Sequence, residues 1–181
     1  MPIDDPHPPT RAEAIFAPWR MAYLESLVPA SAPASSGSFL RAYWLDPSRD
    51  DPNHVVARTA DGLILLNRYP YANGHLLVAL GEAKPRLLDY HASQRASLWR
   101  MVDRAAALLD AALHPQGINI GINEGRAAGA GVPDHLHVHL VPRWGGDTNF
   151  INVVGQIRVI PSSLEAMAER FRAVWATFGQ G

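Results

Sequence analysis

Short runs of apolar residues, bounded by residues that favour turns, recur along the middle of the chain. Thr59-Ala60-Asp61-Gly62 separates the first two runs, and this turn sequence predicts a β-hairpin. The Gly/Ala-rich stretch 124–132 separates the last two runs. The pattern therefore predicts strands at 54–58, 63–66, 75–80, 117–122 and 135–141.

Helical periodicity replaces this pattern in two places. Between 93 and 113, apolar residues recur at intervals of three and four, which places Leu98, Val102 and Leu109 on one face of a long amphipathic helix. Near the C-terminus, Ser162 and Glu165 form an S-x-x-E capping box ahead of a second amphipathic stretch. The fold class expected is α+β, a mostly antiparallel sheet of about five strands with the long helix packed on it and a C-terminal helix.

Two proline-rich stretches set the expected organisation of the chain. Residues 1–10 carry four prolines and residues 29–38 repeat that composition, so both predict loop or extended structure. Between them, Pro18 limits any helix to short pieces, and Trp19 and Tyr23 are expected to dock this arm onto the core. The expected divisions are an N-terminal arm and linker at 1–38, the main domain at 39–155 and a C-terminal helical extension at 156–181.

Composition narrows the class of protein. A chain of 181 residues with 48% hydrophobic residues is long enough for one soluble domain with its own core. It contains no cysteine, which excludes disulfides, thiolate zinc sites and a cysteine nucleophile. A formal net charge of -1 argues against nucleic acid or an anionic membrane as partner. The acidic, proline-broken N-terminus does not match a signal peptide, so we expect a cytoplasmic location.

The segment with the most chemical content is His135-Leu136-His137-Val138-His139. Alternate residues of a strand point to the same face, so the pattern predicts three imidazoles on one side and aliphatic side chains on the other. Three interpretations are open: a solvated strand face, a tetrahedral metal site such as that of a zinc hydrolase, and a phosphate-handling site. In the last of these, a neutral imidazole attacks phosphorus while its neighbours donate hydrogen bonds to the developing charge.

The sequence around the histidines resembles a known family. The segment Gly125–Trp144 resembles the signature of the histidine triad (HIT) superfamily, whose core motif is His-φ-His-φ-His-φ-φ. The segment Leu66–Val78 is similar to the family's hairpin that receives the nucleoside. The likeness runs from about residue 54 to 155, and Trp144–Phe150 is similar to the bacterial diadenosine tetraphosphate phosphorylase/hydrolase-like branch.

This resemblance implies a nucleotide hydrolase or transferase that cleaves dinucleoside polyphosphates at the α-phosphorus through a nucleotidyl-histidine intermediate. It makes His137 the nucleophile, places His139 at the α-phosphate and bridging oxygen, and gives His135 an orienting role. It also places Asn123 at a phosphate. The nucleotide-binding residues that it implies are Asn67 at the ribose hydroxyls, Arg68 beside the base, His75 behind the triad, Gly129, Ala130 and Gly131 at the phosphates, and Trp144.

The resemblance also carries expectations about cofactors and partners. It implies no resident cofactor or metal, and Mg²⁺ would enter only with the phosphates of the substrate. The implied partners are a small-molecule nucleotide and a second copy of the chain. We expect this homodimer to form through the Leu98/Val102/Leu109 face of the long helix, since a self-complementary patch suits a two-fold axis.

The chain departs from the family pattern just before the triad. Residues 131–133 (Gly-Val-Pro) stand where many relatives have polar side chains, so we expect backbone amides to hold an acceptor phosphate. Groups in position to assist them are Asn123, Arg143 and the Trp144 N–H. Asp134 is expected to turn away, because its carboxylate would repel phosphate. Without cysteine, the structural zinc that some bacterial relatives bind near residues 38–41 is excluded.

The sequence leaves open both the acceptor and whether the protein turns over its ligand. Water as acceptor would make the protein a hydrolase, and inorganic phosphate would make it a phosphorylase. A nucleoside phosphoramidase of the same fold, and a nucleotide-binding scaffold with little turnover, are alternatives that fit the same residues.

Overall fold

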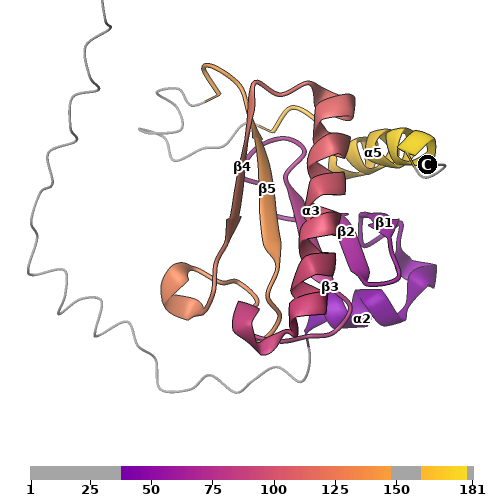
Figure 1. Cartoon of the computed structure of the whole chain (residues 1–181). Coiled ribbons are helices and arrows are strands. Elements are labelled where there is room, and N and C mark those ends of the chain that lie inside the picture. The colour runs from indigo at the N-terminus through magenta and orange to yellow at the C-terminus, as the bar shows by residue number, and fades with distance from the viewer. Residues whose placement is uncertain (1–37, 148–159, 179–181) are drawn as a thin grey trace, which may run out of the picture. The chain divides into compact units, whose positions relative to one another are not determined.

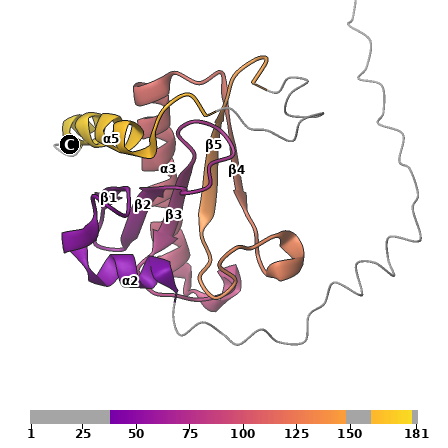
Figure 2. The same ribbon diagram turned by 180° about the vertical axis from the view of Figure 1, so that it is seen from behind.

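The structure is a computed structural model that describes residues 38–147 and 160–178. Its five strands form one antiparallel sheet in the order β1-β2-β3-β5-β4 (Figure 1, Figure 2). The strands are β1 Val55–Arg58, β2 Gly62–Leu66, β3 Leu76–Leu80, β4 Gly117–Ile122 and β5 Val138–Arg143. The helices are α2 Phe39–Leu45, α3 Ala92–Leu113 and α5 Leu164–Phe178, with 3-10 turns at Pro47–Arg49, Leu87–Asp89 and Arg126–Ala128. The predicted α+β fold is confirmed, whereas the predictions for Trp19, Tyr23 and residues 148–155 lie outside the described residues.

The five predicted strands are all present, and the largest error lies at the start of the last one. β5 begins at Val138 and not at His135 as predicted. The Leu136 N–H donates to the Lys84 carbonyl at 2.8 Å, so the backbone is held outside the sheet until Val138. The first two histidines of the triad therefore precede the strand, and only His139 lies within it.

Helices cover both faces of the sheet at β2 and β3, where every residue is buried. Since alternate residues of a strand point to opposite faces, Ile64 and Leu66 join the main core with α3 and α5. Leu63 and Leu65 join a second cluster on the other face, with Leu40 of α2. Burial on both faces explains why these strands are continuous apolar runs. The apolar pattern of the sequence does not predict α2.

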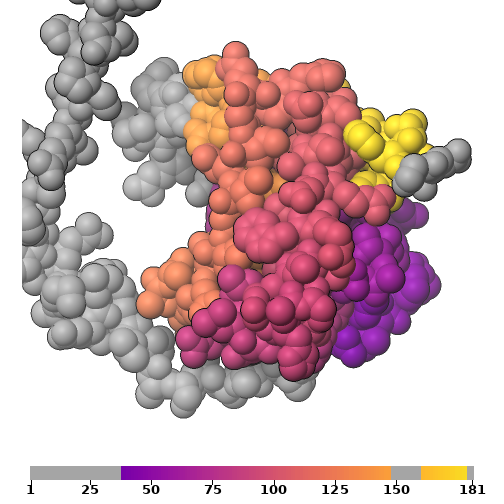
Figure 3. Space-filling model, in the orientation of Figure 1, coloured from indigo at the N-terminus to yellow at the C-terminus, as the bar shows by residue number. Residues whose placement is uncertain are grey.

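The long helix α3 packs across one face of the sheet, and its outer side is exposed on the face seen in Figure 3. Its bounds lie within one residue of the prediction. Leu98, Val102 and Leu109 are all fully buried in the main core. The prediction that these residues pack against a second copy is therefore wrong, because the chain's own sheet covers them.

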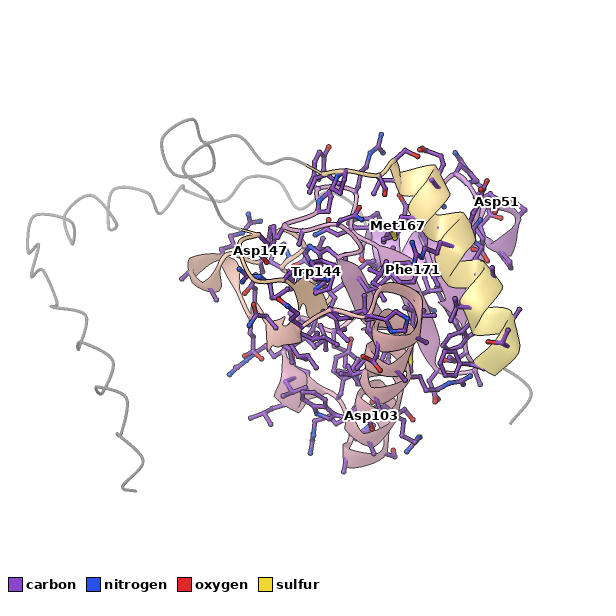
Figure 4. The ribbon with its side chains drawn as sticks, turned by 90° about the horizontal axis from the view of Figure 1, so that it is seen from above. Asp51, Asp103, Trp144, Asp147, Met167 and Phe171 are labelled. Carbon is purple, nitrogen blue, oxygen red and sulfur yellow. The ribbon has the colours of Figure 1, made fainter. Side chains whose placement is uncertain are left out.

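The C-terminal helix α5 packs against α3 and β1. Its buried residues Met167, Ala168 and Phe171 belong to the main core, and Figure 4 shows Met167 and Phe171 on the helix. The helix is thus part of the core of the domain. In the part of the chain that the structure describes, no helix is both long and apolar enough to span a membrane.

The cap of α5 lies one residue later than predicted. Ser163, not Ser162, precedes the first helical residue, and its Oγ accepts a hydrogen bond from the Ala166 N–H at 3.2 Å. Glu165 does not complete a capping box with Ser162. Its carboxylate lies 3.2 Å from Nε2 of His54, at the start of β1.

Candidate functional site

A cavity of about 520 Å³ lies beside the histidine triad. Its walls come from α2, the segment before β1, the turn between β2 and β3, and the loop before the triad. The residues that line it are Phe39, Tyr43, Pro52, Asn53, His54, Leu65, Leu66, Asn67, Arg68, Tyr69, Tyr71, Leu77, Gly129, Gly131, Val132, His137 and His139.

The cavity gathers part of the predicted site. The predicted residues that line it are Asn67, Arg68, Gly129, Gly131, His137 and His139. His75 and His135 are fully buried and connect to the site through hydrogen bonds. Asn123, Ala130 and Trp144 do not line the cavity. Asp134 is exposed and outside the cavity lining, as predicted for a carboxylate near phosphates.

Hydrogen bonding fixes which nitrogen of His137 carries the proton. Its Nδ1 lies 2.9 Å from the backbone carbonyl oxygen of His135. A carbonyl oxygen only accepts hydrogen bonds, so Nδ1 of His137 is the protonated nitrogen. The neutral ring therefore keeps an unprotonated Nε2, the form that a nucleophilic imidazole requires.

The hydrogen bonds of His75 give His139 the opposite tautomer, with the proton on Nε2. The Tyr71 N–H donates to Nδ1 of His75 at 3.1 Å, and the Asn67 side-chain amide lies 3.3 Å from the same atom. Nε2 of His75 therefore carries the proton and donates to Nδ1 of His139 at 3.0 Å. Neutral His139 must then carry its own proton on Nε2. The ring centroids of His137 and His139 are 4.8 Å apart, so a ring with a bare Nε2 lies next to a ring whose Nε2 is a donor.

His135 is anchored at both of its ring nitrogens. Nε2 donates to the Leu80 carbonyl at 2.8 Å, and Nδ1 accepts from the Ser38 hydroxyl at 2.8 Å. This fully buried ring thus ties the residue before α2 to the end of β3. It holds in place the backbone carbonyl that orients His137.

The surroundings favour the neutral form of all three triad rings. Burial lowers the pKa of His139 from 6.5 to about 4, and the nearby His137 adds to this effect. Burial also lowers the pKa of His137, although the hydrogen bond to the His135 carbonyl opposes the shift. The pKa of His135 is lowered mainly by burial as well. An uncharged triad at neutral pH follows.

These lowered pKa values predict an acid-resistant pH profile. If neutral His137 is required, kcat/KM should hold as the pH falls to 6.5 and decline only below it, because the pKa of His137 lies below the ordinary 6.5. The measurement is kcat/KM for diadenosine tetraphosphate between pH 4 and 9, with the Tm followed over the same range to exclude unfolding. An acid limb centred at or above pH 6.5 would contradict the assignment.

The loop before the triad uses most of its amides internally. The Ala128 and Ala130 N–H groups donate to the Gly125 carbonyl, and the Gly129 N–H donates to the Arg126 carbonyl. The N–H groups of Gly129 and Ala130 thus have partners within the loop, and the predicted role of these residues at the phosphates stays a prediction. Glycine at 125 and 129 is required by the fold of the loop, since both have φ above +80°.

Two further groups predicted to assist the acceptor are also committed elsewhere. Arg143 binds Asp147 through two hydrogen bonds of 2.6 and 2.8 Å, and it donates to Asn119 at 2.9 Å. The Trp144 N–H also donates to Asp147, at 3.2 Å, and Figure 4 shows the two residues together. Trp144 follows the far end of β5, about 20 Å along the strand from His137. The prediction that these groups hold a phosphate beside His137 is wrong for a single chain.

Several cavity residues were not predicted from the sequence. Phe39 and Tyr43 of α2 pack edge to face, with ring centroids 5.1 Å apart, and both line the cavity. Asn53 and His54 line it just before β1. Tyr71 stacks on His139 with 16° between the ring planes. The i, i+4 spacing of the two aromatic residues in α2 was the one available signal, since it matches a helical face.

The fold and the site together define a class of protein. The sheet, the long helix across it and the alternating histidines that enter β5 beside a cavity match what the sequence resemblance implied for a histidine triad protein. The HIT domain family matches residues 48–146. The chain belongs to the HIT family.

Individual relatives extend the match. The chain is 36% identical over 165 residues to a Mycobacterium tuberculosis protein named AP-4-A phosphorylase, covering 91% of this chain and 85% of the relative. It is 35% identical over 95 residues to a Schizosaccharomyces pombe protein named bis(5'-nucleosyl)-tetraphosphatase (asymmetrical), covering 52% of each chain. The solved structure of a zinc-bound histidine triad family protein from Mycobacterium smegmatis matches with a TM-score of 0.63 and 30% identity, over 79% of this chain and 98% of that one.

Among the described residues, no group of side chains is suited to a zinc ion like the one in the Mycobacterium smegmatis protein. The sequence contains no cysteine. Within residues 38–147 and 160–178, no three His, Asp or Glu side chains are grouped so as to hold a metal ion. The ring nitrogens of His135 are both engaged by protein groups. The described residues therefore do not fit a resident zinc ion.

Proposed function

We propose that this protein cleaves dinucleoside polyphosphates, such as diadenosine tetraphosphate, at the α-phosphorus through a nucleotidyl adduct on His137. The observation that carries the proposal is the pairing of a bare Nε2 on His137 with a protonated Nε2 on His139 in one cavity. Relatives named as a phosphorylase and a tetraphosphatase of such compounds support the substrate class.

The first chemical step follows from these two nitrogens. Nε2 of His137 attacks the α-phosphorus, an N–P bond forms, and the P–O bond to the bridging oxygen breaks. The remaining nucleotide leaves as an anion, and Nε2–H of His139 donates a hydrogen bond to the bridging oxygen. The adduct leaves positive charge on the ring of His137, and its Nδ1–H donates to the His135 carbonyl, which stabilises that charge.

The second step releases the nucleotide from His137. An oxygen of water or of inorganic phosphate attacks the adduct phosphorus, the N–P bond breaks, and His137 regains its lone pair. Water loses a proton to solvent and yields a nucleoside monophosphate, whereas phosphate yields a nucleoside diphosphate. The relative named as a phosphorylase favours phosphate as the acceptor.

The remaining cavity residues would hold the nucleotide. Oδ1 of Asn67 accepts from the Tyr69 N–H at 3.0 Å and one N–H of its Nδ2 faces Nδ1 of His75, so the second N–H would serve a ribose hydroxyl. Arg68 would lie against the base and Gly131 against the phosphates. His75 acts behind them by fixing the tautomer of His139.

Product analysis tests the proposal. Purified protein is incubated with diadenosine tetraphosphate, with and without inorganic phosphate, and the nucleotides are separated by anion exchange. ADP and ATP in the presence of phosphate would establish phosphorolysis, and AMP and ATP would establish hydrolysis. Binding of the substrate without any product would overturn the catalytic proposal in favour of a nucleotide-binding scaffold.

We propose that no resident metal takes part. Protein dialysed against EDTA and then assayed with Mg²⁺ supplied for the substrate should be as active as untreated protein, because the nucleophile is an imidazole and not a metal-bound hydroxide. Activity is compared before and after dialysis, with bound metals quantified by mass spectrometry. Loss of activity that zinc alone restores would establish the metal-hydrolase alternative instead.

We also propose a homodimer, paired through β4 and not through the buried face of α3. β4 lies at one end of the sheet, its residues are mostly exposed, and Ile120 is 45% exposed. An unpaired strand edge with an exposed apolar side chain favours association.

Sedimentation should show a dimer at micromolar concentration, and Ile120→Lys should shift the protein to monomer. Leu88→Lys, at a site 75% exposed outside the sheet, is the matched control and should leave the dimer intact. A monomeric unmodified protein would contradict the proposal.

A further inference from the structure

His54 has an unusual backbone at the wall of the cavity. Its φ of +53° lies in the left-handed region, and the only other non-glycine residue of this kind in the described part is His114, which caps the end of α3. No helix end explains the conformation of His54. Its N–H donates to the Asp51 carbonyl at 3.1 Å, and its carbonyl accepts from the Leu66 N–H at 3.0 Å. Strained backbone held on both sides is a recurrent feature of functional sites.

The C-terminal helix fixes the surroundings of this residue. Arg172 of α5 donates to the Val55 carbonyl at 2.8 Å and to the Asp51 carboxylate at 2.5 Å, so it holds the chain on both sides of His54. Figure 4 shows Asp51 beside α5. One α5 residue contacts the ring itself, since Oε1 of Glu165 lies 3.2 Å from Nε2 of His54.

This contact determines the hydrogen-bonding character of the free ring nitrogen. The pKa of the Glu165 carboxyl is lowered, mainly by a hydrogen bond from the backbone N–H of Glu165 and next by the contact with His54. Glu165 is therefore ionised and only accepts hydrogen bonds. Nε2 of a neutral His54 must therefore carry the proton, and Nδ1 holds a lone pair. Within the described residues, every buried side-chain nitrogen or oxygen has a hydrogen-bond partner. Nδ1 of His54 makes no hydrogen bond among these residues, so this atom is not buried but open to solvent. The ring that carries it lines the cavity.

The sheet places His54 at a distance from the triad that suits the base of a bound nucleotide and not its phosphate. His54 precedes β1, whereas His139 lies in β5, and β2 and β3 separate the two strands. Three strand spacings amount to about 14 Å. A nucleotide whose α-phosphorus meets His137 would extend its base across β3 and β2 towards His54, between the aromatic residues of α2 and the turn at Arg68.

We propose that His54, oriented by Glu165 of α5, selects a purine with an amino group at the 6-position, adenine over a 6-oxo purine. This inference rests on the proposed function, because it requires a nucleotide in the cavity. The amino group of adenine is a donor and the O6 of guanine or hypoxanthine is an acceptor. A lone pair on Nδ1 accepts from the former and repels the latter. His54 is thus a specificity-determining residue, and Glu165 is the residue that positions it.

Binding of AMP and IMP separates this inference from turnover, because the two nucleotides differ at the 6-position and neither requires cleavage. Calorimetry at pH 8 keeps ordinary imidazoles neutral. The unmodified protein should bind AMP about ten-fold or more tightly than IMP, the discrimination typical of a matched against a mismatched polar group. His54→Gly, which deletes the ring but tolerates the positive φ, should bring the two affinities together.

The positioning role of Glu165 has its own variant and control. Glu165→Gln should also reduce the preference for AMP, since an amide no longer obliges Nε2 of His54 to donate. Glu169→Gln removes a carboxylate one turn further along the exposed side of α5 and should leave the preference unchanged. The Tm of each variant confirms folding.

The outcomes distinguish the inference from the proposed function. Equal binding of AMP and IMP by the unmodified protein, or a preference that survives His54→Gly, would overturn the role of His54 while cleavage of diadenosine tetraphosphate stands. A preference lost in His54→Gly but retained in Glu165→Gln would overturn the role of α5. Absence of binding to either nucleotide, together with absence of cleavage, would instead refute the proposed function.

Discussion

Replacing His137 with alanine is expected to lower turnover of diadenosine tetraphosphate by several powers of ten, about 10³-fold or more, as for other enzymes that lose their nucleophile. The loss is expected to be this large because the tautomer of His139 prevents it from acting as the nucleophile. Nε2 of His139 carries a proton, because its Nδ1 accepts from His75, so this neighbouring ring cannot replace the missing lone pair. The variant should still bind AMP, since the rest of the cavity is unchanged.

The measurement is single-turnover kinetics combined with intact-mass detection of the adduct after acid-free quenching. Unmodified protein should gain the mass of one nucleotidyl group, and His137→Ala should not. His114→Asn is a matched control, because it removes an exposed histidine from a left-handed helix cap that asparagine tolerates. Turnover of His137→Ala within ten-fold of the unmodified protein would exclude a covalent route through this ring.

The triad could be predicted from the sequence because its signal is local. Alternating histidine and aliphatic residues at 135–139 mark the triad in the sequence, and the cavity does contain His137 and His139, although His135 and His137 precede β5. The long helix is similarly predictable, since Leu98, Val102 and Leu109 repeat at helical spacing. What local periodicity does not reveal is the surface that covers an apolar face. The chain's own sheet and a second copy give the same pattern, and this is why the predicted dimer face was wrong.

The partners of the histidines depend on contacts between distant parts of the chain. Ser38 meets His135 across 97 positions, and Glu165 meets His54 across 111. Neither pairing leaves a trace in the spacing of residues, because short loops and the antiparallel sheet bring them together only in the folded state. The assignment of donor and acceptor nitrogens, which determines the chemistry, therefore required the structure.

Loss of Phe171 is expected to reduce the free energy of unfolding by about 3–5 kcal/mol, the cost of deleting a fully buried phenylalanine. Its side chain is 0% exposed and lies in the main core with residues of α3 and the sheet. The ring also packs against the turn before β3: a Cβ added to Gly74 would lie 3.3 Å from Cζ of Phe171. Because Gly74 immediately precedes His75, this contact links α5 to the residue that fixes the tautomer of His139.

Phe178→Ala is the control on the same helix, since Phe178 is 40% exposed. Chemical denaturation of both variants should show the large loss for Phe171→Ala alone, together with a fall in Tm of about 6–20 °C for a chain of this size. Such a loss is a large fraction of the 5–15 kcal/mol typical of folded domains. Similar, small losses in the two variants would mean that α5 is an appendage. A large loss of unfolding free energy for Phe171→Ala alone would show that α5 is an integral part of the folded domain. The proposed selection of a base by His54 requires this, because Glu165 and Arg172 of α5 hold His54 in place.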